Sequence, residues 1–254
     1  MDQTYPQPDR GLWPIAPQPP GSGAEALRRS VGRSGHGGSA HGRSEKPFRA
    51  FPDWWPVWEG ETVAIVAGGP SAKSAEVELT RNRCRVIAIN ESWRLTPWAE
   101  ILYGCDHAWW KRRAGVPEFT GLKLGAERAL QREPWGVRRV IVNRDGDALA
   151  LGQPGRVGWS GNSGFHCVNL AVQMRVAQIL LIGFDMRVDR GLHWHGPHPR
   201  GLNNPNAGNV ARWRACLDAV AERIAAMGVE VINCSEVSAL EAYPKRSLRE
   251  ALAC

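Results

Sequence analysis

One apolar run that stops at two glycines constrains this chain more than any other feature. Residues 62–67 are apolar or β-branched, and Gly68, Gly69, Pro70 and Ser71 follow at once. This pattern predicts a buried strand at 62–67, a tight turn, and a helix at 72–81 with Pro70 and Ser71 at its entrance. Backbone N–H groups in such a turn can bind a phosphate group. A tight strand-to-helix turn that binds no ligand would show the same residues, so both interpretations stay open at this point.

Strand and helix patterns alternate along the rest of the chain. Such alternation predicts an α/β fold, here a Rossmann-like three-layer sandwich with a mostly parallel sheet. A segment rich in Gly and Asp at 144–158 is expected to form a long loop, and long loops in compact domains often carry function. We expect helices at 165–174 and 207–227 and further strands at 85–90, 100–105, 121–125, 137–143, 178–184 and 229–234.

Composition divides the chain in two. Residues 1–47 are rich in Pro, Gly, Ser and Arg, which predicts a disordered arm, and residues 48–254 are expected to form a single Rossmann-like nucleotide-binding domain. The formal net charge of +7 favours acidic partners such as nucleotides or nucleic acid. We find no apolar run of membrane-spanning length and no secretory signal, and the six cysteines are scattered. These features predict a cytoplasmic protein.

Polar residues follow several of the predicted strands. In open α/β sheets, ligands bind beyond the carboxyl ends of the strands. We therefore expect one cleft that gathers the glycine turn with Asn90, Asp106, Asp185 and the segment Ser160, Gly161 and Asn162.

The loop after the strand at 178–184 contains His193, His195 and His198, preceded by Arg187 and Arg190. An imidazole can act as a general base near neutral pH, and arginines can stabilise a departing phosphate. The H-x-H-x-x-H spacing also allows a metal site, but without an obvious fourth ligand we favour a site with no metal.

Trp109 and Trp110 stand beside the basic residues 111–113. Tryptophans next to positive charge could stack on the bases of a nucleic-acid acceptor. A solvated basic helix with buried tryptophans would give the same pattern, and we favour it.

Several short motifs, in this order, carry a resemblance to a known superfamily. It includes the Campylobacter-type bacterial sialyltransferases, proteins of unknown function related to archaeal 6-hydroxymethylpterin diphosphokinases, and a set of bacteriophage and prophage proteins. The phage set looks closest, and a phage protein would act in the host cytoplasm. The motifs are Gly-Gly-Pro-Ser at 68–71, Ile-Asn at 89–90, Ser-Gly at 160–161, Gly-Phe-Asp-Met at 183–186, His-Trp-His-Gly-Pro-His-Pro at 193–199 and Ile-Asn-Cys-Ser at 232–235.

The resemblance implies a glycosyltransferase-like enzyme that moves a sugar from a nucleotide-activated donor to a hydroxyl group of a glycan or nucleic acid, without a metal. It places His193 or His195 as the general base, with Asp185 fixing a ribose or an activating side chain. The tyrosines that such transferases use to stabilise the leaving phosphate have no match here, so that role is either absent or taken by Arg187 or Arg190. The nucleotide itself would contact Gly68, Gly69, Ser71, Asn90, Asp106, Ser160, Gly161 and Asn162.

Two alternatives remain open from the sequence. A diphosphokinase acting on a small heterocycle would need ATP and Mg²⁺, with Asp106 and Asp185 as the magnesium ligands. A non-enzymatic phage structural or nucleic-acid-associated module would use the fold without its chemistry. On the transferase hypothesis, Gly69→Val is expected to abolish nucleotide binding while leaving the fold largely intact, because its side chain would fill the phosphate site.

Overall fold

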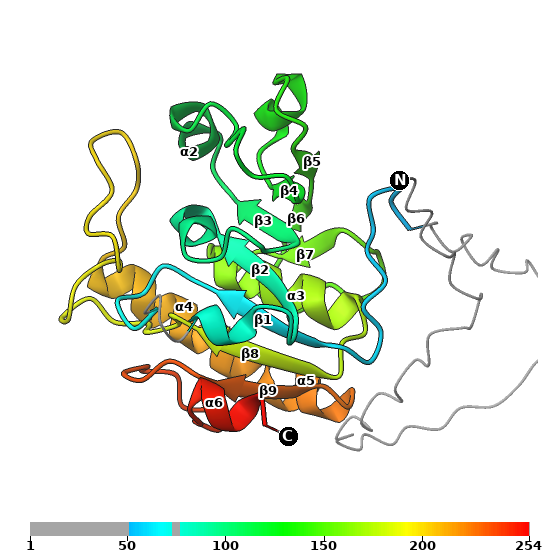
Figure 1. Ribbon diagram of the computed structural model, residues 1–254, viewed down its shortest axis with the longest axis vertical. Helices are drawn as coiled ribbons and strands as arrows, with labels where there is room; N and C mark the ends of the chain where they lie inside the picture. Colours follow the sequence, from blue (N-terminus) through cyan, green and yellow to red (C-terminus); the bar gives the residue numbers. More distant parts are fainter. Residues whose placement is uncertain (1–50, 73–76, 254) are drawn as a thin grey trace, which may run out of the picture. The chain divides into compact units, whose positions relative to one another are not determined.

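The computed structural model describes residues 51–72 and 77–253, which belong to one compact unit; the predicted arm at 1–47 lies outside them. Their main sheet has seven strands in the order β5-β4-β3-β2-β1-β8-β9, and every neighbouring pair is parallel (Figure 1). The predicted α/β fold with a mostly parallel sheet is confirmed. The strands are β1 (Thr62–Val66), β2 (Arg85–Ile89), β3 (Ile101–Gly104), β4 (Leu122–Gly125), β5 (Arg138–Arg139), β8 (Gln178–Ile182) and β9 (Glu230–Asn233).

Alternating side chains of the central strands build a separate apolar core on each face of the sheet. Ile65 and Ile87 belong to one core, which includes residues of α3 (Ser163–Gln173), α4 (Ala207–Ala219) and α5 (Ala221–Ala226). Ala64 and Val86 belong to the other, with α2 (His107–Arg112), α6 (Leu248–Ala251) and the 3₁₀ turn η1 (Glu78–Thr80). Burial on both faces explains why these strands are continuously apolar. Two further 3₁₀ turns are η2 (Asn90–Arg94) and η3 (Arg128–Arg132).

The strand predicted at 137–143 is wrong in one respect, because it divides between two sheets. β4 ends at Gly125, whose carbonyl accepts the Val140 N–H at 2.8 Å, so the main sheet offers no partner beyond that point. The chain continues as β6 (Ile141–Asn143), which pairs in parallel with β7 (Arg156–Gly158). The predicted loop at 144–158 therefore ends in a strand.

Two predicted helices also differ from expectation. The helix at 207–227 breaks at Val220, which ends α4 and begins α5, because its N–H bonds to Leu217 O only three residues back. In the helix predicted at 72–81, residues 73–76 lie outside the described part of the chain. Among the described residues of that range, Ala72 has no regular secondary structure, Val77 is α-helical, and the 3₁₀ turn η1 follows it.

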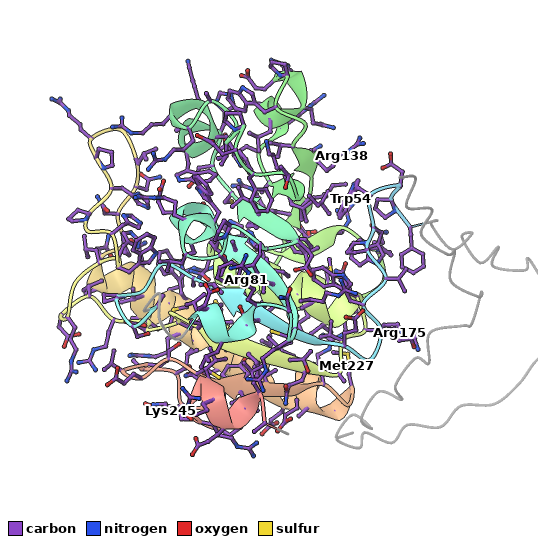
Figure 2. The ribbon with its side chains drawn as sticks, in the orientation of Figure 1. Trp54, Arg81, Arg138, Arg175, Met227 and Lys245 are labelled. Carbon is purple, nitrogen blue, oxygen red and sulfur yellow. The ribbon has the colours of Figure 1, made fainter. Side chains whose placement is uncertain are left out.

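The order of the strands creates a switch point between β1 and β8. From β1 the chain adds β2 to β5 on one side, and only later β8 and β9 on the other. The loop between β8 and α4, yellow in Figure 1, extends from the carboxyl ends of these strands. Arg175 and Met227, which precede β8 and β9, lie at the opposite end (Figure 2). No helix in the described residues is long and apolar enough to cross a membrane.

Candidate functional site

A cavity of about 530 Å³ lies at the carboxyl ends of the central strands. Residues after β1, β2, β3 and β8 line it together with the start of α3 and α4. Three predicted site residues, Ser71, Ser160 and Arg190, are not among the lining residues. The predicted residues that do line it are Gly68, Gly69, Asn90, Asp106, Gly161, Asn162, Asp185, Arg187, His193 and His195.

The glycine turn is pressed against the end of β8. The Gly69 N–H donates to Gly183 O at 2.9 Å. A Cβ atom added at Gly69 would collide with this carbonyl and lie 2.6 Å from Asp185 Oδ1. Gly69 is thus required for a close backbone approach, which argues against the expectation that Gly69→Val leaves the fold largely intact. A Cβ atom at Gly68 would instead lie 3.0 Å from His193 Nδ1, a side-chain atom.

Ser71 and Asp185 bond to each other rather than standing free. The Ser71 N–H donates to Asp185 Oδ2 at 3.0 Å, and the Ser71 hydroxyl donates to Oδ1. Both residues are buried. The Ser71 hydroxyl, expected to contact the nucleotide, is therefore committed to Asp185, which holds the turn in place at the wall of the cleft.

Asn90 and Asp106 approach the cavity from the ends of β2 and β3. Asn90 has a positive φ of 49°, a conformation that asparagine tolerates better than most residues. Asp106 precedes α2 but makes no capping hydrogen bond with its side chain. Desolvation in the cleft raises the pKa of its carboxyl, and the nearby charge of Glu127 adds to this effect.

A hydrogen bond to the loop at 144–158 fixes the segment before α3. Asp147 Oδ1 accepts the N–H of the fully buried Ser160 at 2.9 Å, and Asp147 also forms a two-bond ion pair with Arg212. Ser160 is structural. The Asn162 side chain caps α3 by accepting the Phe165 N–H at 3.0 Å. Of the three predicted residues in this segment, Gly161 and Asn162 line the cavity and can contact a ligand.

His193, His195 and His198 form the histidine cluster. Each offers a ring nitrogen, and these three atoms lie within 4.8 Å of one another. Ring centroids are 5.0 Å apart for His193 and His195, 4.5 Å for His193 and His198, and 5.0 Å for His195 and His198. The cluster lines the cavity, so the topology brings three imidazoles to the glycine turn.

Backbone hydrogen bonds fix the loop that carries the histidine cluster. The Trp194 N–H donates to Gly68 O at 2.9 Å, and the His198 N–H donates to Asn204 Oδ1 at 2.7 Å. The Trp194 indole packs into the core beneath the loop, with Arg94 over its ring at 5.7 Å. It does not line the cavity, which favours a packing role over ligand stacking.

All three imidazoles have lowered pKa values. Burial lowers the pKa of His193 to about 4, with repulsion from His198 and His195 adding to it. Burial also lowers the pKa of His195 and of His198. The lowered pKa values favour the neutral form of each imidazole at pH 7. The buried Nε2 atom of His193 has no hydrogen-bond partner within 51–72 and 77–253.

The two candidate arginines differ in their position relative to the cavity. Arg187 lines the cavity and is half-buried, and its Nε donates to Asp189 Oδ1 at 2.7 Å. That hydrogen bond lowers the pKa of Asp189 to about 2. Arg190 is exposed and does not line the cavity. Of the two, only Arg187 is placed to meet a ligand.

The aromatic residues near the site serve the core. Trp109 and Trp110 are buried, and their indole N–H groups donate to Glu91 Oε1 and Gly104 O, while residues 111–113 are exposed. The stacking surface for nucleic acid is thus excluded, and the basic-helix interpretation is confirmed. Tyr103 and Tyr243 are likewise buried and do not line the cavity.

Some lining residues were not predicted as site residues. Asn209 and Trp213 lie on α4, four residues apart and hence on one helix face. This spacing of four residues was the sequence signal that could have identified Asn209 and Trp213 as neighbours on one helix face. Asn206 caps α4 through a capping box with Asn209. Asn203 and Asn204 also line the cavity.

Comparisons with known proteins give little. No family model matches the chain, and a search of curated proteins finds no match. Among solved structures, the sialyltransferase CstII from Campylobacter jejuni, in complex with a substrate analogue, cytidine-5'-monophosphate, is similar at 11% identity and a TM-score of 0.49. The match covers 74% of this chain and 85% of that one. Similarity this low says nothing about activity.

Proposed function

We propose that this chain is a glycosyltransferase-like enzyme that moves a sugar from a nucleotide-activated donor to a hydroxyl acceptor, on a glycan or a nucleic acid. The observation that carries the proposal is the position of the histidine cluster against the glycine turn, within one cavity at the switch point between β1 and β8. Switch points of this kind are where doubly wound sheets bind nucleotides. The order of the sequence motifs supports the same class.

The donor's phosphate would lie between the glycine turn and Arg187. A Cβ atom at Gly68 would meet only the His193 ring, and Arg187, which is paired with Asp189, lines the same cavity. A cation fixed at the leaving group stabilises the charge that develops when the glycosyl bond breaks. The nucleoside would extend toward Asn162 and the Asn209 face of α4.

The histidine cluster would activate the acceptor. As the acceptor hydroxyl loses its proton, its oxygen bonds to the anomeric carbon of the sugar and the bond from that carbon to the donor phosphate breaks. A neutral imidazole can accept this proton, which requires the unprotonated state that burial favours.

The diphosphokinase alternative has less support. Both carboxylate oxygens of Asp185 already accept hydrogen bonds from Ser71, which leaves this residue poorly disposed to bind Mg²⁺. Asp106 alone would have to hold the ion.

Thermal unfolding of the full chain with CMP, UDP, GDP, ADP, ATP and their sugar conjugates tests the proposal, in Mg²⁺ and in EDTA. A ligand that binds only the folded state raises Tm. We expect one class of nucleotide sugar to raise Tm in EDTA, and that donor is then assayed for sugar transfer. A shift seen only with ATP and Mg²⁺ would favour the diphosphokinase, and no shift would overturn nucleotide binding.

A further inference from the structure

The histidine cluster has the composition and the spacing of a metal site. We propose that His193, His195 and His198 together bind one divalent transition-metal ion, with Zn²⁺ the best match, and leave one coordination position open to the cavity. Ion binding concerns these three side chains alone and does not depend on the proposed function.

The distances suit three ligands on one ion. The three ring nitrogens already lie within 4.8 Å of one another. Bonds of about 2.0–2.1 Å to Zn²⁺ place tetrahedral ligand nitrogens roughly 3.4 Å apart, so small rotations of the rings would close the site. All three rings come from residues 193–198 of one loop, which is held by Trp194 N–H to Gly68 O and by Asn204 at His198.

One ring nitrogen needs a partner that the described protein does not provide. His193 Nε2 is buried and makes no hydrogen bond to any of the described residues. A buried polar atom left unpaired is destabilising, and native proteins rarely leave one. Coordination of an ion would satisfy this lone pair.

The ligand types select a transition metal over Mg²⁺ or Ca²⁺. The cluster contains imidazoles and no carboxylate, and imidazole suits Zn²⁺, Cu²⁺ and Ni²⁺, whereas Mg²⁺ and Ca²⁺ take oxygen ligands. Glu91 also lines the cavity, but it already accepts two hydrogen bonds from Arg113, at 2.7 and 2.6 Å, and one from Trp109. It is not available as a fourth ligand.

Three protein ligands with an open fourth position are typical of catalytic zinc sites. The role of the ion in catalysis rests on the proposed function: the acceptor hydroxyl would bind at the open position. The ion would lower the pKa of that hydroxyl, and its proton would pass to a cavity water as its oxygen bonds to the anomeric carbon and the bond from that carbon to the donor phosphate breaks. The ion would thus replace a free imidazole as the activating group.

The test uses the full chain without a polyhistidine tag, stripped with EDTA and then dialysed free of it. Co²⁺ is titrated first, because its visible absorption reports tetrahedral coordination, and Zn²⁺ is then added to displace it. We expect one ion per chain and a more than 100-fold loss of affinity in His195→Ala and in His198→Ala, beyond the roughly 10–100-fold that loss of an outer partner costs. Thermal unfolding verifies that each variant is folded.

His107→Ala is the matched control, because His107 bonds to Glu133 at 2.8 Å and does not line the main cavity. Absent Co²⁺ absorption, or wild-type affinity in the His195→Ala/His198→Ala double variant, would overturn the inference. Ion binding without any nucleotide-dependent Tm shift would uphold it and overturn the proposed function. Nucleotide binding and sugar transfer without ion binding would uphold the proposed function and overturn the metal site. A free imidazole would then be the general base.

Discussion

Ser71 bonds to both carboxylate oxygens of Asp185 across the switch point, with its N–H donating to Oδ2 at 3.0 Å and its hydroxyl to Oδ1. The two residues are far apart in sequence, one in the turn after β1 and the other just after β8. Their contact joins the two strand ends that form the floor of the cleft. It makes Asp185 a residue that positions the turn, whatever it contributes to a ligand.

The bond between Ser71 and Asp185 predicts strong coupling in a double-mutant cycle. Asp185→Ala is expected to lower the free energy of unfolding by about 2–3 kcal/mol and Ser71→Ala by about 1–2 kcal/mol, because a buried carboxylate accepts both hydrogen bonds. The double variant should lose clearly less than the sum of the two, as measured by urea unfolding. Additive losses would show that the pair does not interact.

Gly69 and Gly68 should respond differently to the same added methyl group. In Gly69→Ala the Cβ atom meets the Gly183 carbonyl, which is backbone and cannot move away, so we expect a loss of about 3 kcal/mol or more. In Gly68→Ala the Cβ atom meets only the His193 ring at 3.0 Å, and the expected loss is within about 1 kcal/mol. Chemical denaturation of both variants makes the comparison. Equal losses would contradict the close approach at Gly69.

Arg187 and Arg190 form a matched pair for nucleotide binding. Arg187→Ala should weaken the binding of a nucleoside diphosphate roughly 10- to 100-fold, because it removes a charge-assisted contact at the cavity wall. Arg190→Ala should change affinity less than about twofold, since its exposed side chain does not line the cavity. Calorimetric titration gives both Kd values. A larger effect at Arg190 would show that the ligand lies outside this cleft.

His166 should make stability depend on pH. Burial lowers the pKa of His166 from 6.5 to about 4 in the folded chain, where its ring nitrogens contact the Tyr103 hydroxyl and Trp159 O. The unfolded chain therefore binds the proton first as pH falls. The stabilisation is complete above about pH 6.5 and is lost progressively as pH falls toward 4, by an amount on the order of 3 kcal/mol.

His166→Asn is the variant that isolates this effect. It should be less stable than the wild type at pH 8, because it loses the contact with Tyr103, yet its stability should fall less between pH 7 and pH 5. Urea unfolding at each pH provides the comparison. Parallel curves for the two proteins would mean that His166 does not titrate as its burial implies.

The sequence alone predicts those elements whose signal lies in neighbouring residues. The apolar run at 62–67 ending at Gly68 predicts β1, and Asn206 predicts the start of α4, because both depend on neighbouring residues. The long apolar strands predict a parallel sheet covered on both faces, and the rule that ligands lie beyond its carboxyl ends predicts the part of the cavity lining that follows the strands. Ten of the predicted site residues line one cavity.

The sequence by itself thus determined the fold class, the position of the cleft and the residue types around it. Only the tertiary structure decided which of those side chains are free, because that depends on contacts between residues distant in the chain. Ser71 is committed to Asp185, Ser160 is held through its backbone N–H by Asp147, and the exposed Arg190 does not line the cavity. The structure also placed three histidines of one loop with their ring nitrogens within 4.8 Å, a convergence that spacing allows but cannot require.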